Sequence, residues 1–349
     1  MRFFRVGMTR DLLKPDGSPA FCDLELTSLG ESDRVACDYL AEDEPEVRPD
    51  QIEGCDALVV LGSSITARTL EGADRLAVIA RLGVGYDSVD VAACTRASVA
   101  LTITPDAVRR PVACSALALV LALGHRLLIK DRLTRAGRWA ERVDNMGTGL
   151  TGRALGVVGL GNIGQEVFHL AAPLGMRHMA SDPSHAAGED AARLGVELVG
   201  LNELLRTADF LCVCCALTPK THHLINAAAL ALMKETAFLI NVARGPIVDQ
   251  AALTHALKSG ALQGAALDVF EEEPIGTHDP LLQLDNVIVT PHAVCWTDEA
   301  FRLMGRSASK SVLDVAAGRV PEYVVNTEVL EDPRFRNRLV QFGTIGKKD

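Results

Sequence analysis

The sequence lacks any excess of basic residues, and this limits the partners that the protein can have. Its 349 residues include 45 acidic and 35 basic side chains, which give a net charge of −10 at pH 7. Nucleic acids and anionic membrane surfaces attract basic patches, so neither is expected as the main partner. A small anionic substrate remains compatible with this charge, because a few arginines can reverse the local field inside one site.

The sequence also lacks a long apolar run. The longest, residues 112–123, has about half the length that a membrane-spanning helix needs. Near the N-terminus, Arg2, Arg5 and Arg10 are accompanied by no apolar stretch long enough for a signal peptide. We therefore expect a cytoplasmic protein that does not enter a membrane.

A metal-binding pattern of cysteines is missing as well. The nine cysteines are scattered, and their only cluster, Cys212, Cys214 and Cys215, lies in an apolar run that predicts a buried strand. No further group of Cys or His follows at the spacing of a structural zinc site. Buried reduced thiols are favoured over a metal site, and we expect no metal.

What the sequence does contain is an alternation of apolar runs with helical patterns. The length suggests about two domains, and the alternation predicts an α/β fold with parallel strands. The expected strands fall into two groups, 57–61, 75–80 and 99–103, then 154–158, 177–181, 210–216, 237–241, 264–268 and 287–290. We expect a long helix from Pro111 roughly to Arg132. A second helix, about 298–317, has no sheet of its own and is expected to pack back on the first domain.

The most informative motif is the glycine-rich loop Gly159-Leu-Gly-Asn-Ile-Gly164. It follows one predicted strand and opens a helix, and the next strand ends at Asp182, 18 residues after Gly164. This context is typical of a dinucleotide site: Gly159 allows the tight turn, Gly161 lets the pyrophosphate approach, and Gly164 lets the helix pack closely on the strand. Asp182 would bind the ribose hydroxyls and repel a 2′-phosphate, which favours NAD over NADP. The alternative is a purely structural strand–turn–helix.

Three further polar groups lie at predicted strand ends, where open α/β sheets bind ligands. They are Arg244, the acidic stretch from Asp268 to Glu273, and His292 after Pro291. Alone, each fits an ordinary surface ion pair, a solvated turn or a structural histidine. Together they match hydride transfer to a 2-oxo acid: a cation for the carboxylate, a histidine for the proton, and a carboxylate that favours the protonated histidine.

These motifs resemble the D-isomer-specific 2-hydroxyacid dehydrogenases over roughly residues 55–325. The resemblance rests on the order and spacing of six stretches, 82–90, 152–164, 217–221, 240–245, 266–274 and 289–292. It implies two Rossmann-like domains with the active site in a cleft between them. A flavodoxin-like substrate domain would comprise 1–106 and 296–349, and a doubly wound NAD-binding domain would comprise 107–295. It also implies a homodimer formed through the cofactor domains.

The resemblance further implies roles for individual residues. His292 would be the acid/base, Glu273 its partner, and Arg244 a substrate ligand. Asp268 would contact the nicotinamide amide, and backbone N–H groups near Val84 and Gly85 would hold the substrate carboxylate. Further positions fall where the family lines the cofactor: Asn162, Ile163, Cys215 and Val242.

Several positions depart from the family pattern. Cys114 replaces a frequent acid, Ala216 replaces a usual proline, and the bulky Trp296 follows the histidine. The chain also reads Leu61-Gly-Ser63 where the phosphoglycerate-oxidising members have an Arg-Ser pair, so a phosphorylated substrate is not expected.

Two other functions remain open at the level of sequence. One is an NADH-sensing binding protein like the related corepressors, and the other is a phosphite- or formate-type dehydrogenase. The favoured interpretation is an NAD-dependent enzyme that interconverts a 2-oxo acid and a D-2-hydroxy acid.

Overall fold

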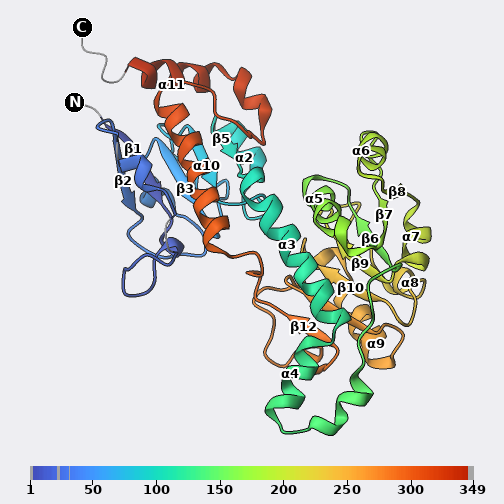
Figure 1. Ribbon diagram of the computed structural model, residues 1–349. Coiled ribbons are helices and arrows are strands. Elements are labelled where there is room, and N and C mark those ends of the chain that lie inside the picture. The colour runs from blue at the N-terminus through green and yellow to red at the C-terminus, as the bar shows by residue number, and fades with distance from the viewer. Residues whose placement is uncertain (1–2, 22–23, 31, 345–349) are drawn as a thin grey trace. The chain divides into compact units, whose positions relative to one another are not determined.

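The computed structural model describes residues 3–21, 24–30 and 32–344 (Figure 1). The chain divides into two compact units. Unit 1 consists of residues 1–108 and 296–349, and unit 2 consists of residues 109–295.

Unit 1 is built on a parallel sheet whose described strands follow the order β2-β1-β3-β4-β5. The strands are β1 (Phe4–Met8), β2 (Val35–Tyr39), β3 (Ala57–Val60), β4 (Val78–Arg81) and β5 (Ala100–Thr102). This order is the flavodoxin-like arrangement of a doubly wound sheet. Sequence reasoning had missed β1 and β2, because Arg5 and Gly7 interrupt the apolar pattern of the first. A Cβ on Gly7 would lie 3.1 Å from the Leu40 side chain and 3.2 Å from that of Leu58 on β3, so these neighbours would have to shift by a few tenths of an ångström.

Helices from both ends of the chain cover this sheet. They are α1 (Thr27–Gly30), α2 (Val91–Arg96), α10 (Asp298–Ala316) and α11 (Pro333–Thr344), with the 3-10 turns η1 (Arg10–Leu12), η2 (Pro49–Ile52) and η7 (Thr327–Glu331). α10 packs against β4, as expected for a helix without a sheet of its own. Phe342 of α11 meets Phe4 of β1 edge to face, with ring centroids 4.9 Å apart. The Arg338 side chain donates to the carbonyls of Leu76 and Ser98, which ties α11 to the loops of the sheet.

Unit 2 carries a second parallel sheet, in the order β12-β11-β10-β9-β6-β7-β8 among its described strands. The strands are β6 (Ala154–Val158), β7 (Arg177–Ser181), β8 (Glu197–Leu198), β9 (Phe210–Val213), β10 (Phe238–Asn241), β11 (Gly264–Leu267) and β12 (Val287–Val289). Counted from β6, this is the dinucleotide-binding order 3-2-1-4-5-6 with one strand added. The six strands expected from the sequence are all present, and the two-residue β8 was missed because it is too short to show a pattern.

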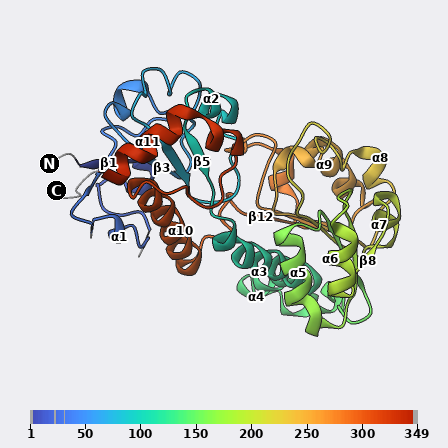
Figure 2. The ribbon, with the colours of Figure 1, turned by 90° about the horizontal axis from the view of Figure 1, so that it is seen from above.

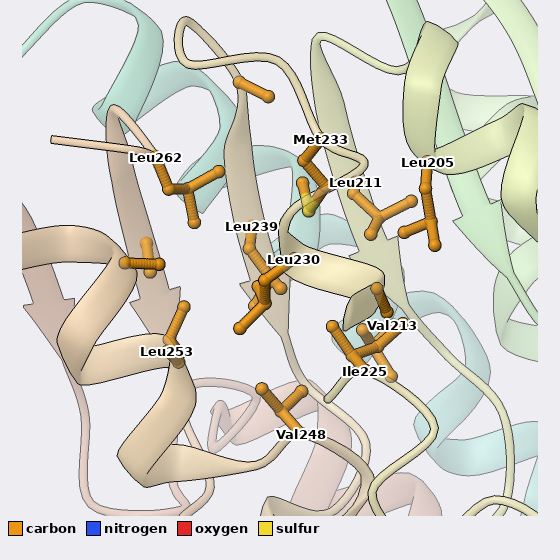
Figure 3. Packing of buried hydrophobic residues seen from close by; sticks show 14 of the residues in the cluster. Leu205, Leu211, Val213, Ile225, Leu230, Met233, Leu239, Val248, Leu253 and Leu262 are labelled. Atoms are coloured by element: carbon orange, nitrogen blue, oxygen red, sulfur yellow. The ribbon is translucent and has the colours of Figure 1, made fainter. Parts of the chain in front are cut away.

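Two apolar layers sandwich the sheet of unit 2. The helices and turns are α4 (Leu127–Arg135), η3 (Trp139–Asn145), α5 (Asn162–Ala171), η4 (Ala172–Leu174), α6 (Ala187–Leu194), α7 (Leu201–Thr207), α8 (Ala227–Leu230), η5 (Gly245–Ile247), α9 (Gln250–Ser259) and η6 (Pro280–Gln283). One core layer lies under α7, α8 and α9 and contains Leu205, Leu230 and Leu253 (Figure 3). The other lies under α3 (Pro105–Gly124), α5 and α6, on the opposite side of unit 2 (Figure 2).

The start and end predicted for the long helix were wrong. α3 begins at Pro105, six residues before Pro111, and it ends at Gly124. Proline is favoured in the first turn of a helix, where Pro105 lies. An internal proline such as Pro111 removes one backbone hydrogen bond without necessarily ending the helix. Arg126 then adopts a left-handed conformation (φ +50°), so α4 starts as a separate helix.

Among the described residues, α3 alone is long and apolar enough to cross a membrane by length and composition. The window that meets this test has a mean hydropathy of 1.5, and 67% of it is buried inside the protein. The apolar face of α3 is therefore used for packing, against the sheet of unit 2.

Candidate active site

The glycine-rich loop between β6 and α5 leaves room for a ligand at one position and none at the other two. Gly159 has φ +95°, and a side chain on it would lie 2.7 Å from the backbone nitrogen of Cys215. A side chain on Gly164 would lie 2.2 Å from the carbonyl oxygen of Gly159. On Gly161 it would meet no described atom within 4 Å. The first and third glycines thus close the loop, and the second faces open space, which fits the close approach of a pyrophosphate.

Asp182, at the end of β7, stabilises this loop as well as being available to a ligand. Its Oδ2 accepts from the Leu160 amide at 2.7 Å and its Oδ1 from the Ser184 amide at 2.8 Å. Each carboxylate oxygen keeps a further lone pair, so both can still accept from ribose hydroxyls. Asn162 and Ile163 form the first turn of α5, where free N–H groups and the helix dipole favour an anion.

Cys215 and Val242 lie beyond the carboxyl ends of β9 and β10. The strand order reverses between β6 and β9, and open α/β sheets bind ligands at such a point. Burial raises the pKa of the Cys215 thiol to about 11, so the side chain is a neutral contact surface. The loop, Asp182 and this strand end are therefore suited to a dinucleotide.

His292 lies in a tight turn after β12. Its amide donates to the Thr290 carbonyl at 3.0 Å, and its backbone is left-handed, with φ +52°. This conformation is rare for a residue with a side chain and is often found at functional sites. The ring nitrogen Nδ1 lies 2.7 Å from Glu273 Oε2, and the two side chains are 45% and 36% exposed. The imidazole is thus oriented by a carboxylate and accessible to a ligand.

The turn that carries His292 is held by Asp268, at the end of β11. Asp268 Oδ1 accepts from the Thr290 hydroxyl at 2.7 Å and from the amides of Ala293 and Val294 at 2.9 and 3.0 Å. Burial raises the pKa of Asp268, against the opposing effect of these hydrogen bonds. The family resemblance predicts that Asp268 contacts the nicotinamide. It gives no indication that Asp268 also holds this turn.

Ser115 of α3 holds the same turn from the other side. Its hydroxyl lies 2.9 Å from the Val294 carbonyl and 2.9 Å from that of Pro111 within the helix. A serine in an apolar helix gives no signal of this contact, since the two residues are 179 positions apart.

Glu273 is held as an anion by its surroundings. Burial opposes ionisation, but hydrogen bonds from His292 and from the Phe270 amide, with the charges of His292 and Arg244, outweigh it and lower the pKa of Glu273. The bond from Phe270 to Oε1 is 2.9 Å long and leaves Oε2 for the imidazole. A carboxylate that stays ionised can support a positive charge on the ring.

Arg244 belongs to a loop that is braced from within and pressed against its neighbour. Asn241 accepts from the Ala243 amide at 3.1 Å and donates to the Arg244 carbonyl at 3.0 Å. The Arg244 guanidinium donates to the Ala243 carbonyl at 2.7 Å. A side chain on Gly245 would lie 1.8 Å from the Phe270 carbonyl oxygen, so only glycine allows the two loops to touch. Asn241 and Gly245 belong to the stretch 240–245, but sequence reasoning assigned neither of them a role in the site.

The structure brings Arg244, Asp268, Glu273 and His292 together in unit 2. They follow β10, β11 and β12, which are neighbours in one sheet. Val84 and Gly85 lie in unit 1, after β4. Their loop is anchored one residue earlier, where the Gly83 amide donates to the Thr104 hydroxyl at 2.8 Å.

The cysteine cluster takes no part in a described metal site. Burial raises the pKa of Cys212 to about 12 and that of Cys214 well above its usual value, so both thiols are protonated. Among the described residues no group of three or more His, Cys, Asp or Glu side chains is placed to hold a metal ion.

Residues 117–294 match the NAD binding domain of the D-isomer specific 2-hydroxyacid dehydrogenases. The chain belongs to this family. It is therefore an NAD-dependent 2-hydroxyacid dehydrogenase in its general class, and unit 2 contains the NAD-binding domain.

Individual relatives agree with the family. A glyoxylate reductase of Korarchaeum cryptofilum is 39% identical over 286 residues, which cover 81% of this chain and 86% of the relative. A D-3-phosphoglycerate dehydrogenase of Methanocaldococcus jannaschii is 42% identical over 79% of this chain, but the match spans only 53% of that protein. The solved D-mandelate dehydrogenase of Rhodotorula graminis is 28% identical with a TM-score of 0.78, over 90% of this chain and 95% of that one.

Proposed function

We propose that this dehydrogenase interconverts a small 2-oxo acid and the corresponding D-2-hydroxy acid with NAD(H), and that glyoxylate is among its substrates. The observation that carries the proposal is the 2.7 Å contact between His292 Nδ1 and Glu273 Oε2, with Arg244 on the adjoining loop. The glyoxylate reductases among its relatives support a small substrate.

In this proposal His292 is the acid/base. An ionised Glu273 accepts a hydrogen bond from Nδ1–H, which leaves Nε2 to give a proton to the substrate oxygen or take one from it. Arg244 binds the substrate carboxylate and polarises the carbonyl. When bound, NADH supplies the hydride for C2. Reduction therefore requires His292 to be protonated, and oxidation requires it to be neutral.

We also propose roles for the remaining residues. Residues 107–295 bind NAD, with Asp182 favouring it over NADP, because a carboxylate repels a 2′-phosphate. Residues 1–106 and 296–349 supply the substrate domain, in which the backbone N–H groups near Val84 and Gly85 hold the substrate carboxylate.

A homodimer formed through unit 2 is proposed as well. Large apolar side chains are exposed on α4 and η3 and just beyond, in particular Trp139 (64%) and Met146 (78%). A hollow of about 150 Å³ at α4 is lined by apolar side chains that include Leu128 and Val287 and by polar ones that include Arg126 and Asp285. Exposed apolar patches are typical of interfaces. A Trp139→Glu variant is expected to sediment as a monomer, and an unchanged mass would contradict this surface.

The substrate is tested with a panel of acids. With NADH, reduction is expected for glyoxylate, hydroxypyruvate and longer 2-oxo acids, and the chiral products should be the D isomers. With NAD, phosphite and formate should give no turnover. NADH binding without reduction of any 2-oxo acid would contradict the proposal and favour a nucleotide-sensing protein, and an L product would contradict the stereochemistry.

A further inference from the structure

A second histidine–glutamate pair, formed by His223 and Glu271, lies outside the proposed chemistry. His223 follows β9, and its Nε2 lies 2.8 Å from Glu271 Oε1. The His223 amide donates to the Pro246 carbonyl at 2.8 Å. His223 therefore contacts both loops of the proposed active site. Pro246 lies in the Arg244 loop, two positions after Arg244, and Glu271 lies two positions before Glu273.

Glu271 is held by more than this pair. The Gln250 amide donates to Glu271 Oε1 at 3.0 Å, and the Glu271 amide donates to Gln250 Oε1 at 3.1 Å. Gln250 is the first residue of α9, a ten-residue helix capped by Asp249. The Glu271 carboxylate therefore lies at a helix N-terminus, where the dipole favours negative charge.

The backbone of His223 supports a specific role. Its φ is +48°, so it shares the left-handed conformation of His292. Such a conformation is unfavourable for a residue with a side chain and persists only where its surroundings impose it. A plain surface ion pair needs no strain of this kind, although the side chains of His223 and Glu271 are 38% and 35% exposed.

We propose that His223 is a positioning residue, which joins the Arg244 loop to the Glu271–Glu273 loop and so keeps Glu273 in contact with His292. The proposal rests on the roles proposed above for Glu273 and His292. His223 acts through Glu271 and the backbone between 271 and 273, and it exchanges no proton with substrate.

The first test is the His223→Ala variant, with NADH binding measured by fluorescence. We expect kcat to fall about tenfold, because a small displacement of a catalytic group is costly. The NADH dissociation constant should stay unchanged. His223→Gln should recover most of the activity, since its amide nitrogen replaces Nε2. His255→Ala, which replaces an exposed histidine of α9, is the matched control and should keep full activity.

A double variant separates positioning from general destabilisation. If His223 acts through Glu273, adding His223→Ala to Glu273→Gln should reduce kcat no further than Glu273→Gln alone. His223→Ala alone should also move the midpoint of kcat/KM for reduction to lower pH, because a displaced Glu273 supports protonated His292 less well. If His223→Ala does not fold, Glu271→Ala is measured by the same criteria.

Full activity of a folded His223→Ala enzyme, or additive losses in the double variant, would overturn the positioning role of His223. Neither result would contradict the proposed function. Full activity of Glu273→Gln would instead overturn the proposed function on which this role rests.

Discussion

The phosphate loop and the His292 turn each follow a parallel strand of unit 2, yet they are held by opposite means. The loop is closed by the absence of side chains at Gly159 and Gly164, which lets backbone atoms touch. The turn is closed by buried polar side chains, chiefly Asp268, whose Oδ1 accepts three hydrogen bonds from it. The loop should therefore fail when an atom is added, and the turn should fail when an acceptor is removed.

The largest effect is expected from Gly164→Ala. The new Cβ would lie 2.2 Å from the Gly159 carbonyl oxygen, so the loop must shift. Overpacking typically costs about 1–3 kcal/mol and more where the contact is with a rigid backbone atom, so we expect a stability loss above about 3 kcal/mol, NADH binding at least about tenfold weaker and a lower thermal midpoint. Isothermal titration and calorimetry measure both.

Gly161→Ala sharpens this prediction. Its Cβ meets no described atom within 4 Å, so we expect weaker NADH binding with an unchanged thermal midpoint. Gly188→Ala, at an equally open position on α6, is the control and should leave NADH binding unchanged without lowering the thermal midpoint, since alanine is favoured over glycine inside a helix. Equal loss of stability in the Gly161 and Gly164 variants would contradict this account, in which a side chain clashes with the backbone at Gly164 and faces open space at Gly161.

A moderate effect is expected from Asp268→Ala. It leaves the Thr290 hydroxyl and the amides of Ala293 and Val294 without their acceptor, which should destabilise unit 2 by about 3 kcal/mol. The calorimetric midpoint should fall by about 5–10 °C. Asp268→Asn keeps one oxygen in place and should remain close to wild type in stability. Equal losses in the two variants would show that charge, and not the acceptor, holds the turn.

The smallest effect concerns the pH dependence of stability through Glu273. Its pKa is lowered in the folded protein, so the ionised form stabilises the fold. This contribution is complete above the unfolded pKa of about 4.3 and is lost as the pH falls through the lower folded value. The stability difference between wild type and Glu273→Gln should therefore shrink as the pH falls below about 4.3. Glu272→Gln, on the exposed neighbour, should show no such trend, and a difference that grows in acid would contradict the sign.

The phosphate loop could be predicted in detail because its determinants are local. Gly159, Gly161 and Gly164 lie within six residues, and the strand and helix around them have clear apolar patterns. The classification of the sheets was also predictable, since six strands of unit 2 are apolar runs with turn residues between them. The ends of α3 were not, because a proline can begin a helix or interrupt one.

The support of the His292 turn could not be predicted, because it comes from residues far away in the chain. Asp268 is 22 residues from Thr290, and Ser115 is 179 residues from Val294. Neither spacing corresponds to a helix or strand period, so only the tertiary structure shows these contacts. Likewise, β1 and β8 form through pairing with neighbouring strands and have little signal of their own.

The central claim, that the His292–Glu273 pair moves the proton, is tested most directly by a single-turnover experiment with His292→Gln and glyoxylate. Glutamine can fill much of the space of histidine but cannot act as an acid at neutral pH. NADH should bind with wild-type affinity, and its oxidation should slow by about 10²–10⁴-fold. Oxidation of bound NADH at the wild-type rate would contradict the account.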